Sequence, residues 1–192
     1  MSKLSARTSS SSKAIRSQYE AHGARGFYEE FGDDYRNPHE PIIRELLASA
    51  AEEWNFLAAN VCALDLACGS GEATLALRLL GCTRVDGIDP FTSKAYLART
   101  QQKAEPFSFA QVATGVLQSQ RYDLCVCSFA MHLAPLSVLP QLCLQLSLCC
   151  RQLLILTPHK RPHIHSDWGW NLKGELLKDR VRARFYESLN FD

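Results

Sequence analysis

A glycine-rich turn separates a short apolar run from a helical stretch in the first half of the chain, and the segment reads Leu64-Asp65-Leu66-Ala67-Cys68-Gly69-Ser70-Gly71. Glycines in such a turn let backbone N–H groups approach a ligand, and the N-terminus of the following helix offers partial positive charge. No GxxxxGK[ST] pattern occurs, which excludes a phosphate loop. The third glycine of GxGxxG is also missing, because Thr74 stands there. The segment therefore predicts the first strand, turn and helix of an α/β fold and leaves the ligand open.

Short apolar runs alternate with helical stretches after residue 60, which is the pattern of strand–helix units and a parallel sheet. The strands are expected at 61–66, 84–88, 106–109, 124–128 and 153–157. The helices between them are expected at 72–80, 93–102, 111–117 and 137–148. Gly81 is expected to end the first of these helices.

The N-terminal part of the chain has a different pattern. Residues 1–17 are rich in Ser and carry four basic residues but no acidic one, so we expect a disordered tail. The same composition suits a mitochondrial or plastid transit peptide, which is the alternative to a cytoplasmic location. Residues 18–60 favour helices, with Asn37-Pro38 as a start signal before an apolar-periodic run. Residues 18–192 are expected to form a single domain.

The C-terminal part alternates with a period of two. Apolar residues at 181, 183 and 185 are interleaved with Arg182, Arg184 and Tyr186, which predicts a strand with one wet face, typical of an antiparallel edge. The preceding stretch, 168–177, fits either a strand or a helix.

Charge and cysteine content exclude several classes of protein. Lys and Arg number 21 against 20 for Asp and Glu, so no overall field recruits nucleic acid or an anionic membrane. The most apolar stretches are interrupted well short of the roughly 20 residues that a spanning helix needs, so we expect no membrane association. The 8 cysteines form no CxxC pair and sit mostly in apolar runs. We therefore expect buried thiols in a reducing compartment and no metal site.

Two carboxylates define the kind of ligand. Asp65, beside the turn, would repel a pyrophosphate but attract an ammonium or a sulfonium. Asp89, at the end of the second expected strand, can accept hydrogen bonds from both hydroxyls of a ribose. Together they describe an aminoacyl nucleoside without phosphates.

The motif Asp65-x-Ala67-x-Gly69-x-Gly71 resembles motif I of the class I S-adenosylmethionine-dependent methyltransferases, with alanine in place of the first glycine. Residues 87–89, 122–127 and 153–157 resemble the second, fourth and fifth strands of that family. The segment 128–133, and Tyr28 with residues 35–38, resemble small-molecule methyltransferases of the ubiquinone-biosynthesis and trans-aconitate type. The resemblance implies a Rossmann-like, doubly wound α/β fold, with a mostly parallel seven-stranded sheet, an antiparallel edge strand and N-terminal capping helices.

The family also implies roles for individual residues. The methionine part of the cofactor would be held by Asp65, Ala67, Gly69 and Gly71, and its ribose by Asp89. Pro90 or Phe91 would line the adenine. Ser108 and Phe109 stand where the family often has an acid that contacts the adenine amino group, and Phe109 could instead stack on the ring. Ser128 opens the segment after the fourth strand and is a further cofactor contact.

The acceptor is the open question. An acceptor that loses a proton would use a base such as His132, although this histidine could instead be a core-edge residue satisfied by the backbone. His159, His163 and His165 follow the fifth strand, where a solvated basic loop is expected rather than a metal site. Amino-directed methyltransferases resemble one another in an Asn/Asp-Pro-Pro-aromatic motif, which residues 128–131 lack.

No inserted substrate domain is evident, so we expect the N-terminal helices and the 159–170 loop to form a lid over a pocket for a small-molecule acceptor. The reaction would be directed to oxygen, carbon or a carboxyl group, in a monomer or homodimer. The alternatives are a protein or RNA methyltransferase that docks its substrate on Arg161, Arg180, Arg182 and Arg184, or a non-catalytic partner subunit.

Overall fold

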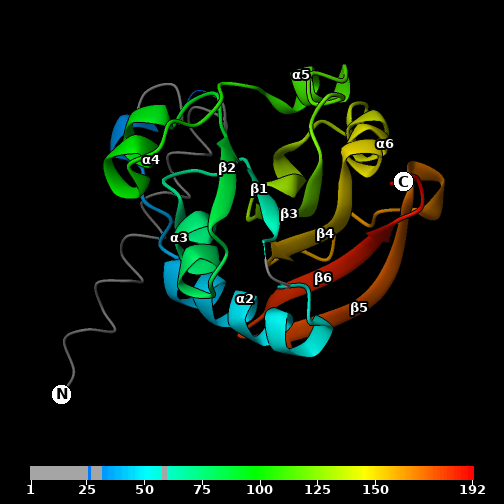
Figure 1. Cartoon of the computed structure of the whole chain (residues 1–192), viewed down its shortest axis with the longest axis horizontal. Coiled ribbons are helices and arrows are strands. Elements are labelled where there is room, and N and C mark those ends of the chain that lie inside the picture. Colours follow the sequence, from blue (N-terminus) through cyan, green and yellow to red (C-terminus); the bar gives the residue numbers. More distant parts are fainter. Residues whose placement is uncertain (1–25, 27–31, 58–59) are drawn as a thin grey trace.

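A six-stranded sheet with helices on both faces forms the body of the molecule (Figure 1). The computed structural model describes residues 26, 32–57 and 60–192. The strand order is β2-β1-β3-β4-β6-β5. The strands are β1 (Cys62–Leu66), β2 (Arg84–Ile88), β3 (Tyr122–Ser128), β4 (Cys150–Thr157), β5 (Trp170–Lys178) and β6 (Val181–Ser188). The helices are α2 (Glu40–Trp54), α3 (Glu72–Leu79), α4 (Ser93–Thr100), α5 (Phe109–Ala113) and α6 (Leu139–Cys149), with short 3₁₀ turns η1 (Gly32–Asp34), η2 (Met131–Leu133) and η3 (Ser166–Trp168).

The parallel half of the sheet follows the sequence pattern closely. The strands expected at 61–66, 84–88, 124–128 and 153–157 are all present, and β2, β1, β3 and β4 run parallel to one another. Strand order reverses at β1, because the chain passes from β1 to β2 on one side and returns to β3 on the other. In open α/β sheets, ligands bind outside the carboxyl ends of the strands at such a switch point.

The strand expected at 106–109 is wrong. Only Glu105 bridges to β2, through Glu105 N–H to the Gly87 carbonyl (2.9 Å) and Asp89 N–H to the Glu105 carbonyl (3.0 Å). The chain then starts α5, because Ser108 and Gln111 form a capping box in which each side chain bonds the other residue's backbone N–H. The expected seventh strand is thereby reduced to one bridge, and the described residues form six strands.

The antiparallel half corrects a second expectation. β6 pairs antiparallel with β4, as predicted, but it is not an edge strand, because β5 pairs with its other side. The ambiguous stretch 168–177 forms this outer strand after η3. The alternation predicted Arg184 on the solvent-exposed face, but the residue is buried. Its guanidinium donates to Glu175 Oε2 (2.6 Å) and to the carbonyls of Pro162 (3.0 Å) and Lys160 (2.8 Å), which offsets the cost of burying the charge.

Two apolar cores lie on opposite faces of the sheet. Alternate residues of β1 supply both, because successive side chains of a strand point to opposite faces: Leu64 belongs to the core under α5 and α6, and Ala63 to the core under α2 and α3. All eight cysteines are buried free thiols, which confirms their expected place in the core.

The capping helices expected over residues 18–60 fall partly outside the described part of the chain. Residues 18–31, apart from 26, lie outside the described part of the chain, and so does the tail at 1–17. α2 is present, but it packs against α3 and against β5 and β6 rather than over the ends of the strands. Its buried stripe of Ile43, Leu46, Leu47 and Ala50 has helical spacing, and Trp54 stacks on Phe185 of β6 with ring centroids 5.0 Å apart.

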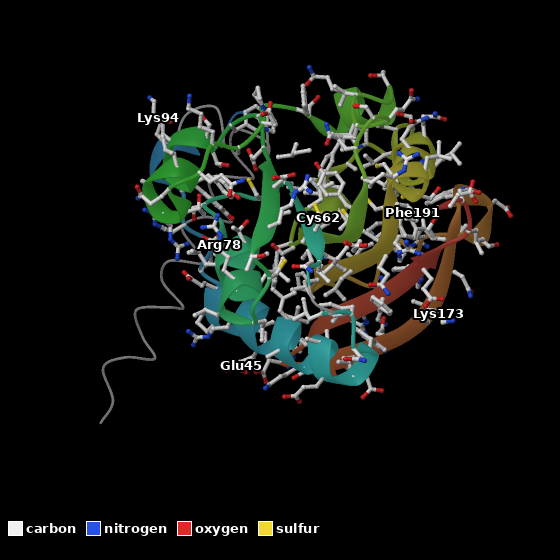
Figure 2. The ribbon with its side chains drawn as sticks, viewed as in Figure 1. Glu45, Cys62, Arg78, Lys94, Lys173 and Phe191 are labelled. Carbon is white, nitrogen blue, oxygen red and sulfur yellow. The ribbon has the colours of Figure 1, made fainter. Side chains whose placement is uncertain are left out.

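Figure 2 shows several charged side chains at the edge of the molecule. Glu45, Lys94 and Lys173 lie at the rim of the molecule, whereas Cys62 lies at the start of the inner strand β1 (Figure 2). Within the described residues, no helix is long and apolar enough to cross a membrane.

Candidate active site

A cavity of about 170 Å³ opens at the carboxyl ends of β1, β2 and β3. Its walls come from the turn after each of these strands, from the start of α5, and from the segment before α2. The lining residues are Tyr35, Asn37, Leu66, Ala67, Cys68, Gly69, Glu72, Asp89, Pro90, Phe91, Phe107, Ser108, Phe109, Ser128, Phe129, Ala130 and Leu133.

Most of the residues expected at the cofactor line this cavity. Seven of them do so: Ala67, Gly69, Asp89, Pro90, Ser108, Phe109 and Ser128. The structure brings these positions together because each follows a strand or precedes a helix at the same edge of the sheet. Asp65, Gly71 and His132 are not part of the lining. Tyr28 lies outside the described residues.

The turn after β1 has an unusual backbone. Ala67 and Gly69 both have left-handed φ angles, of 57° and 55°. A left-handed φ is unfavourable for alanine, so the fold must impose it at Ala67. Gly69 packs under Tyr35, because a Cβ at Gly69 would lie 3.0 Å from Tyr35 Cε1. Gly69 and Tyr35 therefore meet in the wall of the cavity, with no room for a side chain at position 69.

Gly71 supports the turn from behind. It has a φ of 87° and precedes α3 as the N-cap residue. A Cβ at this position would meet Thr100 Cγ2 at 2.5 Å. Gly71 thus allows close packing of α3 on α4 rather than contact with a ligand.

Asp89 organises two loops at once. Its Oδ2 accepts from Gly69 N–H (3.2 Å), and its Oδ1 accepts from the N–H groups of Phe91 (2.9 Å) and Thr92 (3.1 Å). The residue is 8% exposed, and burial raises its pKa despite these hydrogen bonds. A carboxylate has about four lone-pair sites, so it can accept further bonds from the cavity side.

Asp65 lies beneath the turn and is fully buried. Its Oδ2 accepts from the N–H (2.9 Å) and the hydroxyl (2.7 Å) of Thr74, which fixes the first turn of α3 to β1. Its Oδ1 has no hydrogen-bond partner among the described residues. Burial raises the pKa of Asp65 to about 7, and the nearby carboxylates of Glu72 and Asp89 add to this effect.

Several lining residues were missed by the sequence argument. Glu72 follows Gly71 directly and has the signal of an acid in the first turn of a helix, which is ordinarily only a partner for the helix dipole. The aromatic residues Phe107 and Phe129 and the apolar Leu133 have no local signal at all. Phe129 lines the cavity with a left-handed φ of 55°, and its ring stacks on His39 at a centroid distance of 4.7 Å.

His132 lies between residues of the cavity wall but is not one of the lining residues. Its neighbours Ala130 and Leu133 line the wall, whereas its own ring contacts His159, with centroids 4.3 Å apart. Although the residue is exposed at the surface, packing around the ring and the neighbouring His159 lower the pKa of His132 to about 4. The 159–170 loop, expected as part of a lid, supplies none of the described lining residues.

These residues fit an aminoacyl nucleoside. Phe91, Phe107 and Phe109 give apolar walls for a base, and Asp89 lies where a ribose would present its hydroxyls. The turn at Gly69, which lines the cavity, is the end that would receive the charged amino-acid part.

Comparison with known proteins agrees with this geometry. Residues 63–152 match the family model described as a methyltransferase domain. Over 230 aligned positions the chain is 30% identical to an uncharacterised protein of the fission yeast Schizosaccharomyces pombe, and the alignment covers 92% of this chain and 93% of the yeast protein.

Two solved structures share the fold. The magnesium protoporphyrin IX methyltransferase of Synechocystis, crystallised with S-adenosylmethionine, has 17% identity and a TM-score of 0.57, covering 92% of this chain and 95% of that one. A proposed RNA methyltransferase of Pyrococcus horikoshii has 16% identity and a TM-score of 0.59, covering 81% and 85%. The family model, the yeast relative and the fold together place the chain: it belongs to the class I S-adenosylmethionine-dependent methyltransferases and is an enzyme that uses S-adenosylmethionine as its cofactor.

Proposed function

We propose that this enzyme methylates a small-molecule acceptor at an oxygen, a carbon or a carboxyl group. The observation that carries the proposal is the composition of the cavity: its described lining is mostly apolar and aromatic and contains two carboxylates but no Lys or Arg. A nucleic acid needs basic side chains along its path to neutralise phosphates. An enclosed apolar pocket with few polar groups is typical of a site for a small molecule.

The basic patch considered for RNA or protein docking does not support that alternative. Arg184 and Arg182 both pair with Glu175, at 2.6 and 3.4 Å, and their side chains are 4% and 19% exposed. Two of its four arginines are therefore occupied in holding β6 to β5 and to the loop after β4.

When bound, S-adenosylmethionine supplies a methyl group on a positively charged sulfur. The residues of the chain have the tasks of binding, orienting and excluding water. Asp89 and the Gly69 turn hold the nucleoside side of the cavity. Phe129, Leu133 and Tyr35 form its other wall, where they would pack on the acceptor and keep water away.

The experiment is a transfer assay with methyl-labelled S-adenosylmethionine. Purified enzyme is incubated separately with a small-metabolite extract, with total RNA and with a protein extract, each with a heat-inactivated control. We expect label in the metabolite fraction. Label in RNA or protein alone would make the macromolecular alternative correct, and label in none of the three would favour a subunit that needs a partner.

We retain His132 as the proposed base for an acceptor that must lose a proton. A pKa of about 4 leaves the imidazole neutral at pH 7, as a general base must be, but makes it a weak base. We therefore expect His132→Ala to lower kcat by about 10²-fold, the low end of general-base catalysis, with KM little changed. If the kcat of His132→Ala equals that of wild type at every pH from 5 to 9, deprotonation of the acceptor does not use this residue.

A further inference from the structure

A second cavity, of about 340 Å³, shares Phe107 with the active-site cavity, because this side chain lines both. The segment that carries Phe107 bridges to β2 at Glu105 alone and then begins α5. α5 is only five residues long and packs against α6. The chain between Glu105 and β3 thus leaves an open space beside β2, to which no role has been assigned.

The lining of the second cavity combines apolar and polar side chains. The buried Ile88 and Leu117 and the exposed Val116 contribute apolar surface. Tyr122, which is 5% exposed, and the half-buried Asp86 also line the cavity. Asp86 and Ile88 are two residues apart in β2, so their side chains point to the same face of the sheet. A carboxylate therefore lies beside the apolar part of the wall.

The Asp86 carboxylate has acceptor capacity left for a ligand. Burial and, next, the nearby Asp86 carboxylate raise the pKa of Tyr122, so its hydroxyl stays protonated and can donate to Asp86. A carboxylate has about four lone-pair sites, so one such bond leaves others for the cavity. Within the described part of the chain, no Lys or Arg forms an ion pair with Asp86 or with Glu105, a second acid of the lining. Lys103 also lines the cavity but is exposed, so its flexible side chain can turn to solvent.

A carboxylate without a basic partner, next to apolar surface, suits a ligand that has a positive charge and an apolar body. We propose that the second cavity binds a small amine, with its ammonium group on the Asp86 carboxylate and its apolar body against Leu117 and Phe107. Because Phe107 lines both cavities, the amine binds beside the cofactor without entering the cofactor's own cavity. The inference is independent of which acceptor is methylated.

The experiment is calorimetric titration of the enzyme saturated with S-adenosylhomocysteine, which keeps the probes out of the cofactor site. The probes are phenethylamine and 2-phenylethanol, which share an aromatic body and differ only in carrying an amine or a hydroxyl group. Wild type should bind phenethylamine at least about tenfold more tightly than 2-phenylethanol, as expected for a charged hydrogen bond. Asp86→Asn should lose most of this preference, while its affinity for 2-phenylethanol stays within about threefold of wild type.

Glu52→Gln is the matched control, because it removes one negative charge from an exposed position of α2 that does not line the cavity. It should keep the preference for the amine. A second pair of variants does not alter Asp86. Val116 is 41% exposed, so it can be replaced by a longer side chain at little cost. Val116→Arg places a guanidinium at the cavity and should abolish phenethylamine binding, whereas Val116→Ala should keep it within about threefold.

Equal affinities of wild type for the two probes, or no binding of phenethylamine, would overturn the proposal. So would a preference for the amine that survives Asp86→Asn, because the amine then binds elsewhere. The affinity of each variant for S-adenosylhomocysteine is measured first and should equal that of wild type. If Asp86→Asn fails this check because it does not fold, the two Val116 variants decide, and equal phenethylamine binding by both would refute the site.

Discussion

At the level of single residues, two acids flank the glycine turn and have different surroundings. Asp65 looks in the sequence like a ligand-binding carboxylate, but the fold places it below the turn, bonded to Thr74. Glu72 looks like a helix-start acid, but the fold places it in the cavity wall. The two residues differ in position relative to the turn, which is set by how α3 leaves β1 and by nothing in their immediate sequence.

The raised pKa of Asp65 predicts a pH-dependent stability. An aspartate in the unfolded chain ionises near pH 4, whereas the folded pKa is about 7. Below pH 4 the Asp65 carboxyl is protonated in both the folded and the unfolded protein, so it causes no loss of stability there. Between about pH 4 and 7 unfolding releases a proton, so stability falls with rising pH, by at most about 1.4 kcal/mol per pH unit from this group.

Asp65→Asn cannot ionise and should escape this loss. We expect its free energy of unfolding to rise relative to wild type between pH 4 and 7 and to run parallel above pH 7. Urea unfolding of the cofactor-free proteins at pH 4.5, 6, 7 and 8 measures the difference. Parallel profiles over the whole range would mean that Asp65 is ionised when folded.

At the level of elements, one local signal was misread, one was read in part and one was read correctly. The pattern at 106–109 is apolar enough for a strand, but Ser108-x-x-Gln111 is a capping box that begins α5 instead. The alternation at 181–186 correctly predicted an antiparallel strand. It could not show that a second strand, β5, pairs with the outer side of β6, because the sequence of β5 fits a strand or a helix. The turn of glycines before α3 was read correctly, since left-handed backbone has a direct sequence signal.

The two ends of α3 give a matched pair of glycine substitutions, Gly71→Ala at the start and Gly81→Ala just beyond the end. Gly71→Ala adds strain at a φ of 87° and a contact of 2.5 Å with Thr100 Cγ2, so we expect it to lower the free energy of unfolding by roughly 2–4 kcal/mol. Gly81→Ala, at the other end of the helix, has a φ of 94° but open space around its Cβ, so only the strain remains, about 1 kcal/mol. Chemical denaturation of both variants gives the comparison. Equal losses would show that α3 and α4 separate enough to admit the methyl group.

At the level of the whole molecule, the sheet determines where chemistry can occur. Parallel strands bring the ends of β1, β2 and β3 to one edge, and the reversal of strand order at β1 leaves room there for the cavity. α2 and α3 cover one face of the sheet, and α5 and α6 cover the other. Each pair of helices packs on one of the two apolar cores. The antiparallel pair β5 and β6 extends the sheet on the side away from the cavity, where Arg184 fixes the loop after β4.

The sequence by itself determined the parallel strands, the glycine turn and the acid at the end of β2, because each depends on local backbone preference or on the period of apolar residues. The cofactor was implied by the resemblance of these features to a known family. Only the tertiary structure decided which carboxylate faces the cavity, which aromatic residues close it, and that Arg184 is buried. Those outcomes depend on contacts between segments far apart in the chain, such as Glu72 with Asn37 and Arg99, and local pattern has no information on such distances.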